Sequence, residues 1–408
     1  MSYDSDIVIA GGGLNGMTLA LACAAAGQSV TLVDAQIAAR QAEPEFDGRA
    51  YALALTSMRL LDGLGLRAAI EDDAQPMLEI KVTDGRAGEG PSPFFMHFDH
   101  AEIEEGPMGY MVEDRHLRPA LLSTVENAPG IDHLDDTTVT GQSADTSGIT
   151  VTLSSGGSLR ARLLVGCDGR GSGTAIRAGI QRTGWGYGQT ALVCAIAHAK
   201  PHGGTAHQFF MPEGPLAILP LKGDRSSIVW TQGTEAAARV NALPDAAYLD
   251  VLRPRFGDFL GEISLAGGRF SYPLSLSLAN RLVADRVALV GDAAHGVHPI
   301  AGQGLNAGLR DIAALAEVIA DATRRGEDAG APDVLRRYEQ WRRFDNTALA
   351  LATDTFNRLF SNDNPILRAG RDIGMGIVGN WPGLRRAFIR EAAGLTGDLP
   401  RLMQGLPL

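Results

Sequence analysis

The first apolar segments of the chain alternate between strand length and helix length. Residues 7–13 read IVIAGGG, a short apolar run that enters a glycine turn, as a buried parallel strand does. Residues 14–27 form a longer apolar segment that ends on Gly27, a common helix stop. Residues 29–34 form a second buried run that ends on Asp34. This order predicts a βαβ unit at the start of the sequence.

Later segments predict a second sheet of a different kind. Between about 188 and 233, apolar runs are separated by proline and glycine and lack a helical period, which favours a mixed or antiparallel sheet. Residues 149–169 predict a hairpin that turns on Ser-Gly-Gly, with a buried strand after it. Residues 285–322 return to a strand followed by a helix. Other helices are predicted at 111–128, at 244–257 and over most of 333–408, with breaks near Pro365 and Pro382.

The composition argues against several functional classes. The formal net charge is -11, which argues against a general nucleic-acid binder because phosphate contacts need clustered lysine and arginine. Cys23, Cys167 and Cys194 form no CxxC pair, so we expect neither a disulfide framework nor a zinc site, and a reducing compartment fits. The opening residues MSYDSD carry no basic segment, so no signal peptide is predicted. No apolar run has the length of a membrane span.

The turn between the first strand and the first helix carries the pattern G-x-G-x-x-G, formed by Gly11, Gly13 and Gly16. The first glycine permits a tight turn, the second lets the backbone approach a pyrophosphate, and the third lets helix and strand pack closely. The helix N-terminus offers N–H groups and a partial positive charge to the phosphates. Asp34 can accept hydrogen bonds from ribose hydroxyls. The pattern fits NAD and FAD equally well, and a glycine turn that serves packing alone is the alternative.

A second junction of strand and helix, residues 285–311, reads DRVALVGDAAHGVHPIAGQGLNAGLRD. Its strand ends on Asp292, and small residues, two histidines, a proline and a Gly-Gln-Gly turn follow. Together with GGGLNG at 11–16, DGRA at 47–50 and CDGRGS at 167–172, it resembles the flavin-dependent aromatic hydroxylases, the single-component monooxygenases of the para-hydroxybenzoate hydroxylase fold. The segment HPIAGQGLN and the C-terminal tail are most similar to the hydroxylases of ubiquinone biosynthesis, which hydroxylate the ring of a polyprenylated phenol.

The resemblance implies an α/β fold with three parts. These are an FAD-binding Rossmann-like domain of the glutathione-reductase type, an inserted substrate domain built on a mixed or antiparallel sheet, and C-terminal helices. The chain has no second G-x-G-x-x-G after a strand, and in the resembled family NAD(P)H binds transiently without a domain of its own. The expected division gives 1–75, 101–180 and 272–335 to the FAD-binding domain, 76–100 and 181–271 to the substrate-binding sheet domain, and 336–408 to the C-terminal helical segment.

The resemblance also implies roles for individual residues. Asp292 would be a buried acceptor for the ribityl chain of FAD. Gly302 and the residues after it would present backbone N–H groups to the flavin edge that becomes negative on reduction. Pro299 would shape the wall beside the flavin ring, and His298 is a candidate for contact with substrate or flavin. The expected cofactor-binding residues are Gly11, Gly13, Leu14, Asn15, Gly16, Asp34, Arg49, Arg115, Asp168, Gly291, Asp292, Gly302, Gln303, Gly304, Leu305 and Asn306, and the expected catalytic residues are His298, Pro299 and Gly302.

Several of these residues have a simpler explanation. His295 and His298 have the spacing of a metal pair, but no third ligand follows at a suitable distance, so we expect no metal. We expect His295 to be a structural hydrogen-bonding residue. Asp168 is open to the interpretation of an ordinary strand–turn residue, and Arg115 to that of a solvated helix residue. No residue stands out as a catalytic base.

The activity that the resemblance implies is that of a monooxygenase. NAD(P)H would reduce the bound FAD, the reduced flavin would react with O2 to give a C4a-hydroperoxide, and an electron-rich polyprenylphenol of ubiquinone biosynthesis would attack its distal oxygen. The alternative is a flavin oxidoreductase of the same fold that acts on a lipid or quinone without oxygenation.

The C-terminal tail contains a pattern that relates to where the protein would encounter such a substrate. Residues 382–395 read PGLRRAFIREAAGL, an amphipathic pattern with apolar residues on one face and arginines on others. A helix that docks on the rest of the protein and a helix that meets a membrane surface or a partner in a biosynthetic complex both fit this pattern. We expect a cytoplasmic protein, which in the second case is peripheral at the inner membrane. The residues of the pattern are Leu384, Phe388 and Ala392 on the apolar face, and Arg385, Arg386 and Arg390.

Overall fold

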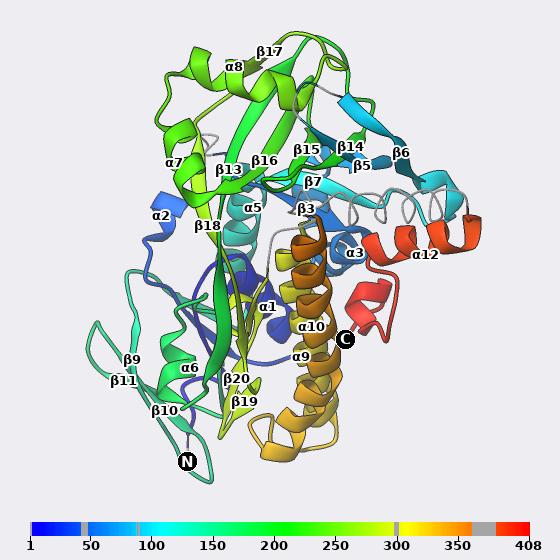
Figure 1. Ribbon diagram of the computed structural model, residues 1–408. Coiled ribbons are helices and arrows are strands. Elements are labelled where there is room, and N and C mark those ends of the chain that lie inside the picture. Colours follow the sequence, from blue (N-terminus) through cyan, green and yellow to red (C-terminus); the bar gives the residue numbers. More distant parts are fainter. Residues whose placement is uncertain (1, 42–47, 87, 89, 298–301, 361–380) are drawn as a thin grey trace.

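The computed structural model describes residues 2–41, 48–86, 88, 90–297, 302–360 and 381–408. Two regions follow one another along the long axis of the molecule in Figure 1. The lower region holds a mostly parallel sheet with long helices beside it, and the upper region holds a larger, mostly antiparallel sheet. The predicted class, an α/β fold with a second mixed sheet and C-terminal helices, is confirmed.

A parallel sheet forms the core of the lower region. Its strands lie in the order β19 (Val283–Ala284), β20 (Val287–Leu289), β12 (Leu163–Gly166), β1 (Ile7–Ala10), β2 (Val30–Val33) and β8 (Ile131–Leu134). Neighbouring strands are parallel, except that β19 and β20 are antiparallel. Every residue of β1, β2 and β12 is buried, which explains why these strands are continuous apolar runs and not alternating ones.

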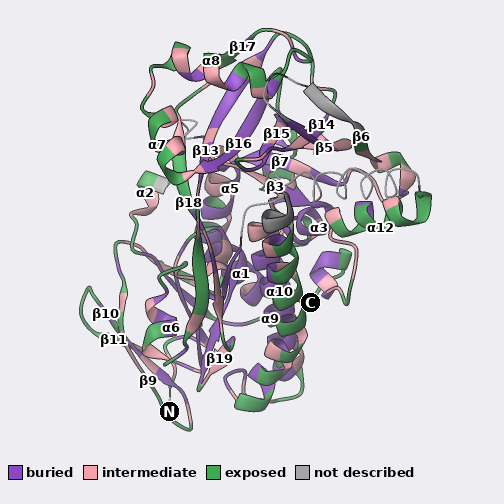
Figure 2. Cartoon of the chain, in the orientation of Figure 1, coloured by how far each residue is buried: buried purple, intermediate pink, exposed green. Residues whose placement is uncertain are grey.

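Long helices pack beside this sheet, and Figure 2 shows their buried inner sides. They are α1 (Leu14–Ala25), α3 (Leu55–Gly63), α5 (Asp114–Asn127), α9 (Gln303–Arg324) and α10 (Pro332–Phe360). The helix α9 contacts both α1 and α10. Its residues Ile312, Leu315 and Ile319 are fully buried, and their helical spacing forms the stripe that faces the core.

The upper region is built on one large sheet. Among the described residues its strands lie in the order β21 (His295–Gly296), β18 (Phe270–Ala279), β13 (Arg182–His198), β16 (Arg225–Gly233), β15 (Leu216–Leu221), β14 (Thr205–Phe210), β5 (Glu79–Arg86) and β6 (Gly90–Asp99), and β17 (Ile263–Leu265) also pairs with β13. Neighbours are antiparallel, except that β14 and β5 are parallel. The mixed sheet predicted from the apolar runs is therefore present.

The two faces of the large sheet have different neighbours. One face packs under α7 (Thr234–Asn241) and α8 (Asp245–Phe256), where Trp230 and Tyr248 are fully buried with ring centroids 6.1 Å apart. On the other face, Ala206 and Leu221 pack against a small sheet formed by β3 (Ala50–Ala54), β7 (Gly109–Glu113) and β4 (Gln75–Met77). The small sheet therefore joins the large sheet to the lower region.

The remaining elements are short. The predicted hairpin is present as β10 and β11, which pair antiparallel and form a separate sheet with β9. These and the other short elements are β9 (Val139–Ala144), β10 (Ile149–Leu153), β11 (Ser158–Ala161), α2 (Ala38–Gln41), α4 (Arg67–Ile70), α6 (Gly173–Arg177), η1 (Glu71–Asp73), η2 (His100–Glu102), η3 (Gly291–Ala293) and η5 (Arg401–Gln404).

The helix α12 (Pro382–Ala392) docks near β6 and η2. Its residue Ile389 is fully buried, and the ring of Phe388 lies 6.0 Å from that of Phe98. Arg385 forms an ion pair with Glu102 at 2.6 Å, and Arg390 pairs with Glu105. Apolar contact and ion pairing therefore both hold this helix on the protein.

The sequence patterns misplaced some elements. The predicted helix at 111–128 begins only at Asp114, because Met111 and Val112 are fully buried in β7, which pairs with β3. The helix α7 and the β5–β6 hairpin were not predicted. Pro365 lies outside the described residues, whereas Pro382 stands in the first turn of α12.

Candidate active site

The glycines of the first turn serve different purposes. Gly11 has a φ of +105°, and a Cβ there would lie 2.5 Å from the carbonyl oxygen of Cys167. A Cβ on Gly16 would lie 1.8 Å from the carbonyl oxygen of Gly11. A Cβ on Gly13 would meet no atom within 4 Å, and Gly13 precedes α1 without any side-chain cap. Gly11 and Gly16 are thus required by packing, while Gly13 keeps the approach to the helix N-terminus open.

Asp34 lies against this turn. It follows β2, is buried, and its Oδ1 accepts the backbone N–H of Gln36 at 3.0 Å. A Cβ on Gly12 would lie 2.4 Å from Asp34 Oδ2, so the carboxylate folds over the glycine turn. The acid expected beside the turn is therefore there.

Asn15 joins the first turn to the second. A Cβ on Gly291 would lie 2.2 Å from its Nδ2, and a Cβ on Gly308 would lie 2.7 Å from its Oδ1. The side chain of Asn15 is thus inserted between η3 and α9, where its buried Oδ1 has no hydrogen-bond partner among the described residues. The side chain of Asn15 therefore packs into the protein. The backbone N–H groups of Leu14 and Asn15, in the first turn of α1, are the donors available to a phosphate.

Asp292 pairs with an arginine where the second turn begins. It lies in η3 after β20, and its side chain is 43% exposed. Nε–H of Arg170 donates to its Oδ2 at 3.1 Å. Arg182 donates to the backbone oxygens of Asp292, at 3.1 Å, and of Ala293. Two arginines therefore fix this turn, one through the carboxylate of Asp292 and one through the backbone.

A fully buried charged cluster lies behind the second turn. Asp311 of α9 accepts from His295 Nε2 at 2.6 Å, from Arg342 Nε at 2.8 Å and from the backbone N–H of Gly291 at 3.2 Å. Asn346 donates to the same carboxylate at 3.2 Å and accepts from Arg342 at 2.9 Å. Although burial alone would raise it, the pKa of Asp311 is lowered, because His295 and Arg342 stabilise the carboxylate. His295 is thus the structural hydrogen-bonding residue that the sequence predicted, although no residue in the described part of the chain bonds to its buried Nδ1.

The start of α9 is a second helix N-terminus near the glycine turn. Gly302 precedes it with a φ of +65°, and a Cβ there would lie 2.9 Å from the Cβ of Ala52. A Cβ on Gly304 would meet no atom within 4 Å, whereas Leu305 packs against the core. Gln303 begins the helix, whose N-terminus has no side-chain cap and no acidic residue in its first turn. A partial positive charge is therefore presented here as well.

Asn306 ties the start of α9 to β3 and α3. Its Oδ1 accepts from the backbone N–H of Ala54 at 2.9 Å and from Ser57 Oγ at 2.8 Å, and its Nδ2 donates to the carbonyls of Ala52 and Gly302 at 2.8 and 3.1 Å. These contacts occupy the amide on both sides. Asn306 therefore shapes the site from within the protein.

Three other predicted residues have protein partners. The carboxylate of Asp168 accepts from Ser172 Oγ at 2.5 Å and from the N–H and Oγ1 of Thr174, both at 2.9 Å, so it anchors the start of α6. Arg49 pairs with Asp114 at 3.0 Å, and Arg115 pairs with Glu113 at 2.8 Å. His298 and Pro299 lie outside the described residues.

Most of the predicted site residues thus lie close together at the ends of the strands. Contacts of Gly11 with Cys167, of Asn15 with Gly291 and of Gly302 with Ala52 join the three sequence motifs and the start of α9. The sequence reasoning did not find Arg170, Arg182, Asp311 and Arg342. Arg170 and Asp311 stand inside the quoted motifs and were visible as charged residues there, whereas no local signal marks Arg182 or Arg342.

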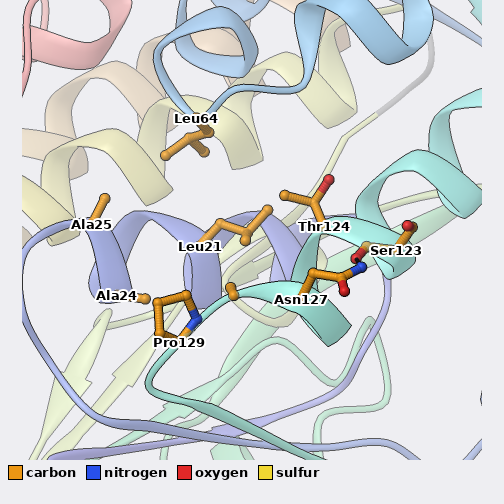
Figure 3. A pocket seen from close by; sticks show the side chains of 9 residues that line it. Leu21, Ala24, Ala25, Leu64, Ser123, Thr124, Asn127 and Pro129 are labelled. Carbon is orange, nitrogen blue, oxygen red and sulfur yellow. Dashed lines mark hydrogen bonds between the residues drawn. The ribbon is translucent and has the colours of Figure 1, made fainter.

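A pocket of about 500 Å³ lies elsewhere (Figure 3). It is at the far end of α1 from the glycine turn, and Thr124 and Asn127 use their polar groups within α5. The pocket offers no charged group and does not belong to the candidate site. Its lining residues are Leu21, Ala24, Ala25, Leu64, Ser123, Thr124, Asn127, Ala128 and Pro129.

Comparisons with known proteins show what the chain is similar to. The family model described as FAD binding domain matches residues 4–350. The ubiquinone hydroxylase UbiL of Rhodospirillum rubrum is 46% identical over 99% of this chain and 94% of its own length. The 3-demethoxyubiquinol 3-hydroxylase of Escherichia coli is 32% identical over 96% of this chain and 99% of its own length. The p-nitrophenol 4-monooxygenase PnpA of Pseudomonas putida has the same fold, with a TM-score of 0.79 at 20% identity over 98% of this chain and all of that one.

The buried cluster generates a stability prediction. Asp311→Asn is expected to lower the free energy of unfolding by about 3 kcal/mol, because it removes the buried carboxylate that pairs with Arg342 and leaves this guanidinium paired with Asp345, at 2.6 Å. Asp333→Asn is the matched control, since Asp333 on α10 is 61% exposed in a loose pair with Arg337 and should cost less than about 1 kcal/mol. Urea unfolding of the two variants measures both, and equal losses would contradict the cluster's role.

The pH dependence of this contribution has a definite sign. Because the folded-state pKa of Asp311 is lowered, its stabilising effect is complete above the pKa of the unfolded chain, about 3.9, and is lost as the pH falls further towards the folded-state value. The difference in unfolding free energy between wild type and Asp311→Asn should therefore shrink below about pH 4.

Proposed function

Since the chain belongs to the family of proteins with this FAD binding domain, we propose that it uses FAD, NAD(P)H and O2 to hydroxylate the aromatic ring of a polyprenylphenol intermediate in ubiquinone biosynthesis. The observation that carries the proposal is the meeting of two uncapped helix N-termini, those of α1 and α9, at the strand ends beside Asp34 and Asp292. Relatives named as ubiquinone hydroxylases support the choice of substrate.

The residues present fit FAD. Backbone N–H groups at the start of α1 suit a pyrophosphate, and the open position at Gly13 lets it come close. Asp34 would accept from ribose hydroxyls and Asp292 from the ribityl chain. The segment Gly302, Gln303 and Gly304 would place N–H groups at the flavin ring. Gly11, Gly16 and Gly291 shape the backbone around these groups.

Other predicted residues would act less directly. Arg49 and Arg115 are proposed to face the adenosine or pyrophosphate side of FAD while paired with acids, which keeps their positions fixed. Asp168, Asn15 and Asn306 would hold the loops that form the cradle, since their side chains are engaged within the protein. His298 and Pro299 remain proposed contacts of the flavin or substrate.

FAD, when bound, supplies the redox chemistry that passes electrons from NAD(P)H to O2. The protein must then orient the phenol and keep water away. Ala206, Leu219 and Leu221 of the large sheet form an apolar cluster with Ala52, which touches Gly302 at the start of α9. We propose that the ring and the first part of the prenyl tail lie beside Leu219 and Ala52, the half-buried members of this cluster, because they present apolar surface next to the start of α9.

This assignment divides the chain by task. Residues 1–75, 101–180 and 272–335 would hold FAD, 76–100 and 181–271 would cover the substrate, and 336–408 would support both. The strand β18 continues from the substrate part into the FAD-binding part and pairs with β21, so the two parts share one sheet.

The helix α12 is proposed to meet a membrane surface, where a polyprenylated substrate is found. No helix among the described residues is long and apolar enough to cross a membrane. Two of the three arginines of α12 are engaged with Glu102 and Glu105, so the basic face is largely neutralised. Support comes instead from Trp381, Leu384 and Phe388, which are 65%, 38% and 39% exposed.

The central experiment measures O2 consumption and product together. Purified protein with FAD, NAD(P)H and a short-chain prenylphenol should consume O2 only with the phenol present and yield a product one oxygen heavier by mass spectrometry. Oxidation of the substrate without added oxygen would instead establish the alternative, a flavin oxidoreductase that acts on a lipid or quinone.

Gly13→Val should lose most bound FAD while the protein stays folded, because the new side chain would fill the open approach to the N-terminus of α1. Gly233→Val is the matched control, since Gly233 precedes α7 and a Cβ there also meets no atom within 4 Å. Flavin absorbance per protein after gel filtration gives the readout. Equal flavin content in both variants would remove the phosphate role of the first turn.

Membrane contact can be tested by vesicle sedimentation. Wild type should co-sediment with vesicles to nearly the same extent at low and high salt, because the arginines are paired. The double change Trp381→Ser with Leu384→Ser should abolish sedimentation, whereas Phe344→Ser with Leu351→Ser, at exposed positions of α10, should not. Equal sedimentation of wild type and the α12 variant would exclude this surface.

A further inference from the structure

Arg170 lies in a loop whose shape is fixed from one side. The loop joins β12 to α6, and the carboxylate of Asp168 accepts hydrogen bonds from Ser172 and Thr174. Ser172 in turn caps α6 by accepting from the backbone N–H of Ala175 at 2.9 Å. The backbone on both sides of Arg170 is therefore held before its side chain makes any contact.

The side chain of Arg170 lies against Gly296 of β21. A Cβ on Gly296 would lie 3.2 Å from its Nε, 3.5 Å from its Cδ and 3.6 Å from its Cγ. A side chain at this position would crowd the arginine at its stem and at the nitrogen that donates. The absence of a side chain at Gly296 thus lets Arg170 lie close to β21 and reach Asp292.

The partner of Arg170 is equally well anchored. The backbone of the η3 turn that carries Asp292 is held by Arg182 through two carbonyls, and by Asp311 through the N–H of Gly291. An ordinary surface ion pair joins two flexible side chains and contributes little. Here the side chain of Arg170 packs against Gly296, and Asp292 belongs to a turn whose backbone is held in place. The ion pair therefore restricts the rotamer of Asp292.

The contact uses only part of the Asp292 carboxylate. Nε of Arg170 donates to Oδ2 at 3.1 Å, and no described residue donates to Oδ1. A carboxylate has about four lone-pair positions, so Oδ1 can still accept from a hydroxyl. Because a guanidinium stays charged at any ordinary pH, this anchoring persists across the working range.

We propose that Arg170 is a positioning residue for the cofactor: it holds the carboxylate of Asp292 in one orientation, ready to accept a hydroxyl of the ribityl chain. The inference rests on the proposed function, because it takes Asp292 to be the ribityl acceptor. It adds a residue that touches the acid and not the cofactor.

The test is a double-mutant cycle in FAD affinity. Flavin-free protein is titrated with FAD, and quenching of flavin fluorescence gives Kd for wild type, Arg170→Ala, Asp292→Asn and the double variant. Arg170→Ala should raise Kd about fivefold, Asp292→Asn should raise it more, and the double variant should equal Asp292→Asn alone. The thermal midpoint of each flavin-free protein should match wild type, because the pair is at the surface.

Two further variants separate position from charge. Arg281→Ala removes an exposed arginine whose hydrogen bonds within the described ranges go to the carbonyls of Ala178 and Gly179, and it should leave Kd unchanged. Arg170→Lys keeps the charge but not the donor at Nε, and it should stay at least about threefold weaker than wild type. Full recovery by lysine, or an equal loss in Arg281→Ala, overturns the positioning role in favour of net charge.

The outcomes also separate the two proposals. If Asp292→Asn weakens FAD binding while Arg170→Ala binds as wild type does or more tightly, the inference on Arg170 is wrong and the FAD site stands. If Asp292→Asn binds FAD with wild-type affinity, the ribityl assignment is wrong, and the inference that depends on it is overturned with it.

Discussion

A buried carboxylate must keep its counter-charges, and much of this structure is arranged around that requirement. Asp311 is fully buried, and its partners come from η3, β21 and α10. Removing any one partner would leave charge or hydrogen-bonding capacity unsatisfied in a medium of low dielectric constant. Hydrogen bonds and ion pairs to Asp311 therefore hold the second turn, α9 and α10 together, in addition to the apolar contacts that they share.

The cluster explains why the second turn sits where it does. β20 ends at the edge of the parallel sheet, and the N–H of Gly291 then meets Asp311 from the third turn of α9. The side chain of Asn15 fills the remaining space between η3 and α9. Two turns that are distant in sequence thus face the same space, and each contributes one helix N-terminus to it. This common placement is what makes a single extended dinucleotide a suitable ligand.

The local parts of this arrangement could be predicted from the sequence. A continuous apolar run predicts a buried parallel strand, and the positions of Gly11, Gly13 and Gly16 predict a turn open to phosphate, since both depend on residues close in the chain. The buried pairing of Asp311 with Arg342 could not be predicted, because it joins two helices through tertiary packing alone. For the same reason the pairing of Asp292 with Arg170 could not be predicted, because only the fold brings these two residues together.

Asn306 makes four hydrogen bonds from one amide, to β3, to α3 and to the residue before α9. The start of α9 and the neighbouring apolar face at Ala52 therefore form one rigid body. Fixing the backbone costs roughly 1–2 kcal/mol of conformational entropy per residue. Here this loss of entropy occurs once, when the chain folds. The proposed substrate site is therefore set before a ligand enters, and binding then costs mainly the ligand's own freedom of motion.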